Sequence, residues 1–178
     1  SEDSTPTQPE SSGNPTVSAL SFSAASNTWT ARAPLPIPLP YPSATSLGVA
    51  PDAAGNSIVY AIGGTDGESG YSGYPIEAYD LATDTWAPKN TRVDTSELNG
   101  VGLIGGKLYY SGGYVFHEFT YLPSLDAYDP VADVAVGKAM MPAATDDGVT
   151  GVIGGKLFVL PGTCGLPSDC EQEATRAL

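Results

Sequence analysis

Residues 106–130, GKLYYSGGYVFHEFTYLPSLDAYDP, decide the fold, because a version of them stands earlier in the chain at residues 56–81, NSIVYAIGGTDGESGYSGYPIEAYDL. Both stretches contain an apolar run that ends in two glycines, and both reach an Ala-Tyr-Asp motif. The glycine motifs end at Gly64, Gly113 and, in a third copy FVLPG, at Gly162, so the period is 49 residues each time. A fixed period of this length indicates repeated supersecondary units.

A second motif keeps the same spacing. EAYDLATDTW (77–86) and DAYDPVADVA (126–135) are 49 residues apart, and LSFSAASNTW (20–29) is an earlier version, 57 residues upstream. Each unit therefore predicts four short strands, a to d, with a tight turn between a and b and a long loop between b and c. Gly105-Gly106 and Gly154-Gly155 can adopt the positive φ that a type I′ turn requires at both central positions between strands a and b. The glycine pair that ends strand b has a different role, because a residue without Cβ lets the backbones of neighbouring units approach closely.

These features resemble the kelch repeat of β-propeller proteins. The family pattern is a strand ending in a glycine pair, a variable loop, a Tyr-Asp pair and a tryptophan about six residues later. One copy satisfies it fully, with Gly63-Gly64, Tyr79-Asp80 and Trp86. We expect Trp29 and Trp86 to fill the wedges between adjacent blades. The other copies depart from the family pattern: the next has Gly112-Gly113 and Tyr128-Asp129 but Ala135 in place of tryptophan, and the last has Pro161-Gly162. The resemblance covers about residues 17–178 and implies an all-β, kelch-like β-propeller.

The strand count implies an incomplete ring. Residues 1–16 form a Ser/Thr/Pro-rich stretch that we expect to be a flexible tail. Repeat units follow at about 17–47, 48–96, 97–147 and 148–178, which amounts to about three blades' worth of four-stranded sheets. Propellers close with about four to eight blades. Two explanations remain open: a partial propeller belonging to a longer chain or complex, or half of a six-bladed ring completed as a homodimer.

Composition excludes some partners and favours export. The 178 residues hold 20 acidic and 7 basic side chains, a formal net charge of −13. This charge disfavours nucleic acid and anionic membrane surfaces. The tail is typical of a mature exported chain, extracellular or periplasmic, and of a lipoprotein whose lipid-modified cysteine lies upstream. We expect no cofactor.

The two cysteines lie in GTCGLPSDCEQ. A small disulfide between Cys164 and Cys170 is the favoured interpretation, and two reduced thiols are the alternative. A zinc site normally needs four ligands, and the chain has only these thiols and one histidine, so we predict no metal. Asp146 and Asp147 offer carboxylates to calcium, but an Asp-Gly turn explains them without an ion.

Antiparallel order places all the b-to-c and d-to-a connections on one face, and the long loops fall in this set. Loops on a rigid sheet scaffold are the usual site of recognition. The stretch YVFHEFTY is the most unusual, and its rings could either anchor a partner or simply cover the rim. The predicted binding residues on this face are Tyr71, Tyr74, Arg92, Tyr114, Phe116, His117, Glu118, Phe119 and Tyr121.

His117 is the only histidine. Kelch-like copper oxidases use two histidines, so the resemblance does not extend to copper chemistry. Sugar mutarotases of similar fold need only acid and base side chains, for which His117, Glu118, Arg92 and Asp94 are candidates. No spacing marks them as partners, and we assign no catalytic residue. The sequence predicts a non-enzymatic binding or scaffolding subunit that recognises a protein partner, with a carbohydrate-binding or sugar-isomerising propeller as the alternative.

Overall fold

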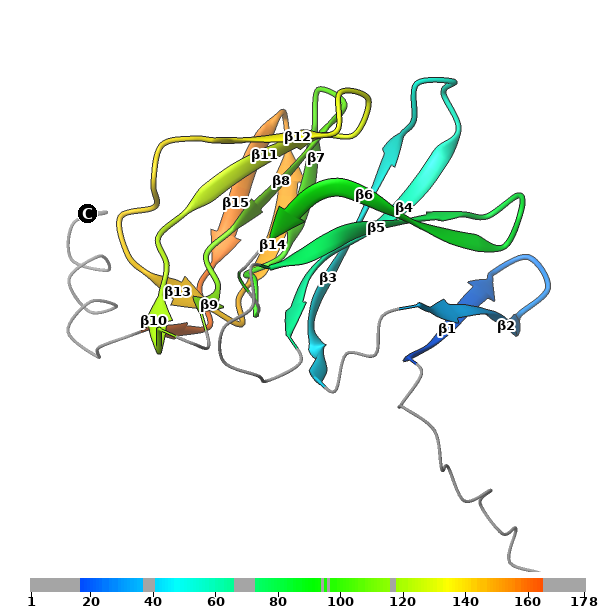
Figure 1. Cartoon of the computed structure of the whole chain (residues 1–178), viewed down its shortest axis with the longest axis horizontal. Helices are drawn as coiled ribbons and strands as arrows, with labels where there is room; N and C mark the ends of the chain where they lie inside the picture. Colours follow the sequence, from blue (N-terminus) through cyan, green and yellow to red (C-terminus); the bar gives the residue numbers. More distant parts are fainter. Residues whose placement is uncertain are drawn as a thin grey trace, which may run out of the picture.

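The computed structural model describes residues 17–36, 41–65, 73–93, 95, 97–115 and 118–164. Every element in these residues is a β-strand, and all strand pairs are antiparallel, which confirms the predicted all-β class (Figure 1). Within the described part of the chain, no helix has the length and apolar character needed to cross a bilayer.

Four sheets follow one another along the chain, and in each the strands are ordered as in the sequence. The first holds β1 (Val17–Ser23) and β2 (Thr28–Leu35). The second holds β3 (Tyr41–Pro51), β4 (Ser57–Thr65), β5 (Tyr74–Asp80) and β6 (Thr85–Val93). The third holds β7 (Val101–Ile104), β8 (Lys107–Ser111), β11 (Leu125–Asp129) and β12 (Val134–Gly137). The fourth holds β14 (Val149–Ile153) and β15 (Lys156–Leu160).

Where the structure describes them, the connections predicted to share one face do so. In Figure 1 the tight a-to-b and c-to-d turns project to one end of the sheets, and the described parts of the connections from β8 to β11 and from β12 to β14 lie at the other. Part of these connections is more ordered than predicted, because two short strand pairs form among them. These are β9 (Tyr114–Val115) with β10 (Thr120–Tyr121), and β13 (Thr145–Asp146) with β16 (Thr163–Cys164).

The predicted glycine turns between strands a and b are confirmed. Gly105 and Gly106 have φ of 57° and 79°, and Gly154 and Gly155 have 58° and 72°. Both central residues of a type I′ turn need positive φ, which glycine adopts without steric cost. The turn chemistry therefore fixes the register of β7 with β8 and of β14 with β15.

The turns between strands c and d share a tyrosine–aspartate hydrogen bond. The Tyr79 hydroxyl donates to Asp84 Oδ1 at 2.5 Å, and the Tyr128 hydroxyl donates to Asp133 Oδ1 at 3.0 Å. Both aspartates have φ of 54°, in the left-handed region that aspartate tolerates better than most residues. The spacing between Tyr and Asp thus has a structural reason in these two turns, whereas the β1–β2 turn has Phe22 and Asn27 in these places and lacks the hydrogen bond.

The same carboxylates join neighbouring sheets. The Ala33 amide of β2 donates to Asp84 Oδ1 at 3.0 Å, and the Asn90 amide of β6 donates to Asp133 Oδ2 at 2.8 Å. Each c-to-d turn therefore holds the last strand of the sheet before it. Hydrogen bonds to a charged acceptor are stronger than those between neutral groups.

These bonds predict a loss of stability in acid at Asp133. Burial opposes its charge, but hydrogen bonds from Asn90, Tyr128 and Thr91 outweigh burial and lower the pKa of Asp133 from 3.8 to about 2. The stabilisation is present above pH 3.8 and is lost as pH falls through about 2. We expect Asp133→Ala to reduce the free energy of unfolding by about 2 kcal/mol at pH 7. Urea denaturation at pH 7 and pH 2 checks this: a deficit equally large at pH 2 would contradict it.

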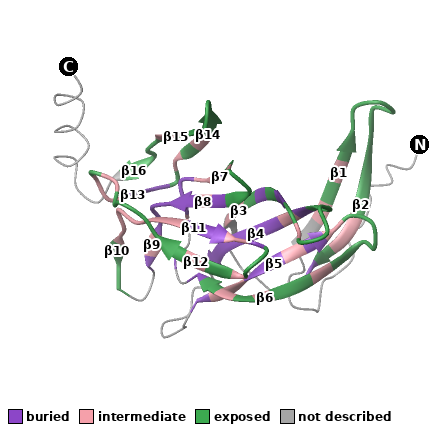
Figure 2. Cartoon of the chain, turned by 90° about the horizontal axis from the view of Figure 1, so that it is seen from above, coloured by how far each residue is buried: buried purple, intermediate pink, exposed green. Residues whose placement is uncertain are grey.

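The core lies between the second and third sheets. We call the side of a sheet that faces the next sheet in the chain its forward face, and the opposite side its backward face. Tyr60 of β4 meets Tyr128 of β11 across this core edge to face, with ring centroids 5.8 Å apart. Gly48 of β3 leaves a slot that Val101 and Leu108 of the third sheet fill. Figure 2 shows burial concentrated in these central strands and exposure at the two ends of the series.

The two tryptophans, expected to fill wedges between adjacent blades, differ. Trp86 does so: it packs on Leu35 and Ala61, and its indole Nε1–H donates to the Ala33 carbonyl at 2.8 Å. For Trp29 the expectation is wrong, because 67% of its surface is exposed. Its ring still contacts the ring of Phe22, with centroids 5.1 Å apart. Trp29 lies in the first sheet, and no described sheet precedes it.

Candidate functional site

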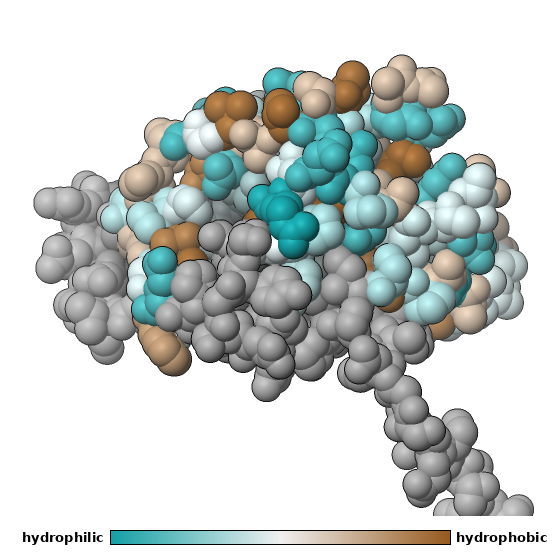
Figure 3. All heavy atoms as spheres, in the orientation of Figure 1, coloured by the Kyte–Doolittle hydropathy of each residue, from teal (hydrophilic) through white to brown (hydrophobic). Residues whose placement is uncertain are grey.

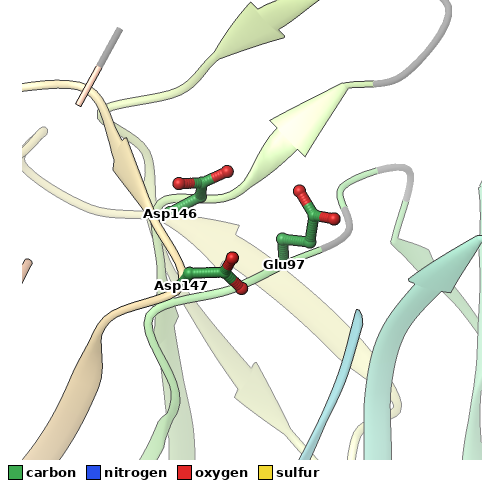
Figure 4. Close-up of side chains that lie close together, drawn as sticks. All are labelled: Glu97, Asp146 and Asp147. Atoms are coloured by element: carbon green, nitrogen blue, oxygen red, sulfur yellow. The ribbon is translucent and has the colours of Figure 1, made fainter. Parts of the chain in front are cut away.

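Three carboxylates gather at the long-loop end of the molecule. Glu97 lies between β6 and β7, Asp146 belongs to β13, and Asp147 follows it. One oxygen from each residue lies within 4.8 Å of the others, and the side chains extend toward a common region (Figure 4). The two contributing segments are both d-to-a connections, so adjacent sheets bring together groups 49 positions apart.

A buried asparagine holds the two connections in place. Asn99 has no exposed surface, its Nδ2 donates to Thr145 Oγ1 at 2.9 Å, and its Oδ1 accepts from the Gly148 amide at 3.0 Å. The Asp147 amide donates to the Glu97 carbonyl at 3.0 Å. These bonds join the backbone on both sides of the carboxylates, so the cluster is positioned by rigid structure.

Glycine allows the close approach that this arrangement needs. A Cβ on Gly112 would meet the Asn99 side chain and the Thr145 carbonyl, so no larger residue fits there without movement. The Gly113 amide donates to the same carbonyl at 2.9 Å. The sequence argument that the glycine pair ending strand b permits backbone contact between neighbouring units is confirmed here.

Negative charge at the cluster is disfavoured by its surroundings. Burial raises the pKa of Glu97, and Asp147 and Asp146 raise it further. Burial and then Asp147 raise the pKa of Asp146. Asp146 is almost fully buried, and its Oδ1 has no hydrogen-bond partner. No lysine or arginine of the described segments contributes to either shift, so the cluster is an uncompensated acidic site.

Two of the three residues also have a left-handed backbone. Glu97 has φ of 54° and Asp147 has φ of 49°. The aspartates of the c-to-d turns adopt the same conformation, so Asp147 tolerates it, whereas for Glu97 it costs on the order of 1 kcal/mol. Strain at Glu97 together with like-charge repulsion is unfavourable for folding, and such features concentrate at functional sites.

Two tyrosines flank the carboxylates. Tyr114 of β9 and Tyr121 of β10 are cross-strand partners, with ring centroids 5.0 Å apart and planes at 58°. Burial raises the pKa of the Tyr121 hydroxyl, and the charge of Asp146 raises it further. Carboxylates beside aromatic faces can bind a guanidinium, an ammonium or a divalent cation, and the aromatic pair favours the organic cations.

The remaining predicted residues have varied positions. Phe119 is 80% exposed with φ of 52°, and the neighbouring Glu118 is exposed. Tyr74 packs with Leu35 and Ala61 in a small apolar cluster, so its ring is largely structural. Arg92 donates from Nε and Nη2 to the Gly73 carbonyl at 3.0 and 2.5 Å, which fixes the end of the b-to-c loop.

Other predicted residues lie outside the described residues, namely Tyr71, Asp94, Phe116, His117 and Cys170. The disulfide from Cys164 to Cys170 therefore remains a prediction. Only the backbone of Cys164 is placed, paired with Thr145 in the β13–β16 ladder.

The predicted binding residues include none of the three carboxylates: the sequence attributes Asp146 and Asp147 to an Asp-Gly turn, and it does not single out Glu97. Glu97 stands 49 residues before Asp146, so the repeat puts both at the same point of successive units. That coincidence was available in the sequence, but it becomes a signal only once the two connections are known to meet.

Comparison with protein-family models finds no match, and comparison with curated proteins finds none either.

Removing one charge from the cluster is expected to stabilise the protein. Glu97→Gln replaces a carboxylate with an amide that can donate to Asp146, and should raise Tm at pH 7 by about 2–4 °C, the shift that 1 kcal/mol gives in a domain of this size. A raised folded-state pKa makes the parent lose stability as pH rises through the usual carboxyl range, so the difference should vanish below pH 4. Calorimetry at both pH values measures this, and a lower Tm for the variant at pH 7 would contradict it.

Proposed function

We propose that the four sheets are consecutive blades of a kelch-like β-propeller, with two complete blades between two half blades. The strand order of the complete sheets, the 49-residue period and the aspartate bonds between neighbouring sheets support this arrangement. In such a fold the b-to-c and d-to-a connections form one recognition surface.

The function that the geometry supports best is non-enzymatic: a binding or scaffolding subunit that recognises a basic segment of a protein partner through its long-loop face. The observation that carries this proposal is the uncompensated cluster of Glu97, Asp146 and Asp147. A buried carboxylate oxygen without a partner is costly, and an incoming cationic group would relieve the cost. The overall charge of −13 would steer basic partners toward this surface.

Neighbouring side chains suit the same partner. A guanidinium can donate two parallel hydrogen bonds to a carboxylate while its face lies against a tyrosine ring. The cation–π contact with the ring is worth about 0.5–2 kcal/mol. Tyr114 and Tyr121 supply such rings beside the cluster. Phe119 adds an exposed apolar side chain on the same hairpin, where a partner could cover it.

Titration calorimetry with a short arginine peptide tests this proposal, with the glutamine counterpart of the peptide as the negative ligand. We expect selective binding that weakens as salt rises, and an affinity about tenfold lower for Asp146→Asn. Asp80→Asn is the matched control, because Asp80 lies on a c-to-d turn at the opposite end and asparagine can still accept from the Ala82 amide. Equal binding of the two peptides, or no effect of Asp146→Asn, would refute the proposal.

Carbohydrate binding or isomerisation is the second candidate, favoured by one observation. Glu97 and Asp146 have raised pKa values beside tyrosine rings, and a protonated carboxyl next to an aromatic face is suited to sugar chemistry. A glycan array with the parent chain and Glu97→Gln separates the two functions. A sugar signal lost in the variant supports this candidate, and an empty array removes it.

Export is the third part of the proposal. The composition of residues 1–16 and the close pair Cys164 and Cys170 suit an extracellular or periplasmic protein. Intact mass after alkylation without reductant measures the state of the cysteines: unmodified cysteines support an oxidised pair, and two added labels contradict it.

A further inference from the structure

The two ends of the sheet series carry unpartnered apolar faces. On the forward face of the fourth sheet the exposed apolar residues are Val149, Ile153, Phe158 and Leu160. On the backward face of the second sheet, Leu47 and Val49 of β3 are 63% and 51% exposed. Figure 3 shows that the broad side of the molecule instead intersperses apolar and hydrophilic side chains. Sheet faces of this composition normally pack against another layer.

A series of glycines shows what kind of layer is missing. Gly48, Gly102 and Gly151 occupy the same position in β3, β7 and β14, because their cross-strand partners are the repeat-equivalent Tyr60, Tyr109 and Phe158. A Cβ on Gly48 would lie 2.6 Å from Val101 and 2.9 Å from Leu108, both in the next sheet. A Cβ on Gly102 would lie 2.6 Å from both Val152 and Leu157. A Cβ on Gly151 would meet nothing within 4 Å.

The chain carries side chains that match the empty slot. The residues that fill the slots of Gly48 and Gly102 come from the backward faces of the third and fourth sheets. On the backward face of the second sheet the equivalent positions are Leu47, Val49 and Val59, taken from the pairing of β3 with β4. Leu47 and Val49 are the exposed residues described above. One end therefore has an open slot, and the other end has the apolar side chains of the type that fill it.

We propose that a second copy of this chain docks its second sheet onto the fourth sheet, with Leu47 and Val49 of one copy entering the slot at Gly151 of the other. The contact continues the interface that already joins the second sheet to the third and the third to the fourth. Because each copy offers both faces, two copies form two such contacts. Together they hold the strands of six four-stranded sheets, a number with which propellers close.

Free strand edges support the same occupant. In both complete sheets the second strand pairs with the third, β4 with β5 and β8 with β11. β15 is the second strand of the fourth sheet and lacks such a partner among the described strands, and β1 has an open edge in the first sheet. Pairing β15 with β1 of the other copy completes a sheet of four strands and covers both edges. The register of the complete sheets would place Leu157 opposite Phe22 of the other copy.

Sedimentation velocity of the full chain tests the proposal. We expect a species of twice the 18.2 kDa chain mass that becomes more populated as salt screens the acidic charge. Gly151→Leu fills the slot, and Leu47→Asp replaces the apolar side chain that should enter the slot with a charged one. Each should weaken dimerisation by at least about tenfold, the effect of 1.4 kcal/mol. Val136→Asp is the control, because Val136 is 53% exposed on β12, away from both faces.

Mixing the two variants gives a sharper result. A dimer of Gly151→Leu with Leu47→Asp has one contact with both defects and one contact with none. Mixing should therefore restore dimer that neither variant forms alone. If the dimer instead formed through one surface that contacts the same surface of the other copy, mixing the variants would give no such rescue. A monomer at all concentrations, which is the result expected if another segment or a different protein covers these faces, would overturn the proposal, as would a dimer insensitive to both substitutions.

The folded state of each variant needs its own measurement. Gly151 and Leu47 are open to solvent in the single chain, so circular dichroism of dilute samples should match the parent. This inference rests on the blade arrangement proposed above but uses a surface separate from the carboxylate cluster. Arginine-peptide binding by the dimer-defective variants therefore distinguishes failure of one proposal from failure of the other.

Discussion

Gly48→Val is expected to lower the free energy of unfolding by about 3 kcal/mol or more, because the new side chain would overlap Val101 and Leu108 at the centre of the core. Leu108 has no exposed surface and cannot move aside without displacing its neighbours. Gly48 does not have a positive φ, so the backbone accepts valine there, and valine is favoured in strands. The loss therefore reports the close approach of two sheets and not backbone strain.

Gly151→Val is the matched control for this prediction. It introduces the same side chain at the same position of β14, where nothing lies within 4 Å. At protein concentrations where the chain is monomeric, urea denaturation should show a stability within about 0.5 kcal/mol of the parent. Equal losses at Gly48 and Gly151 would contradict the steric explanation, because they would point to a backbone requirement shared by both sites.

The strands and turns could be predicted because their causes are local and repeated. The double glycines at 105–106 and 154–155 indicate the type of the a-to-b turn, and the Tyr-Asp motif marks strand c, which precedes the c-to-d turn. Three glycine motifs at one spacing also located β4, β8 and β15, the second strands of the second, third and fourth sheets in complete-sheet order. The physical requirement for glycine differs between positions, since Gly105 adopts the positive φ of a turn and Gly48 leaves space for side chains of the next sheet.

The candidate site could be predicted only in part, because it depends on contacts between distant segments. The aromatic hairpin drew attention through composition, and it does contribute Tyr114 and Tyr121. The carboxylate cluster required knowing that two connections, each polar and unremarkable in sequence, meet at Asn99. The exposure of Trp29 had a similar cause, since a repeat motif does not reveal whether a neighbouring sheet is there to cover it.

The site is also the place where folding and function would conflict. Glu97 combines backbone strain with repulsion from Asp146 and Asp147, whereas carboxylates of the c-to-d turns, such as Asp133, accept hydrogen bonds from several donors. The carboxylates of this chain thus divide into those that stabilise the fold and those that destabilise it. Only the second group lies beside the tyrosine pair, which is why we assign recognition to that surface.

Asn99→Leu should be the most damaging change at the site, with an expected loss of about 3 kcal/mol. Leucine has nearly the same size but no polar atoms, so it would leave the Gly148 amide and the Thr145 hydroxyl without their partner. The Thr145 side chain is buried and the Gly148 amide is partly buried, and an unmet hydrogen bond in a buried place costs more than an absent one. Because the asparagine joins two connections, Tyr121 and the carboxylates should lose their relative positions as well.

Asn99→Asp makes the prediction specific to hydrogen bonding. The aspartate keeps an acceptor for the Gly148 amide but replaces the donor to Thr145 Oγ1 with an oxygen, and it adds a fourth negative charge beside Glu97 and Asp146. The variant should be strongly destabilised at pH 7 and should recover near pH 4, because protonation removes the charge and restores a donor. Thermal unfolding across this range measures the effect. A deficit that does not change with pH would mean that Asn99 acts through its shape and not through its hydrogen bonds.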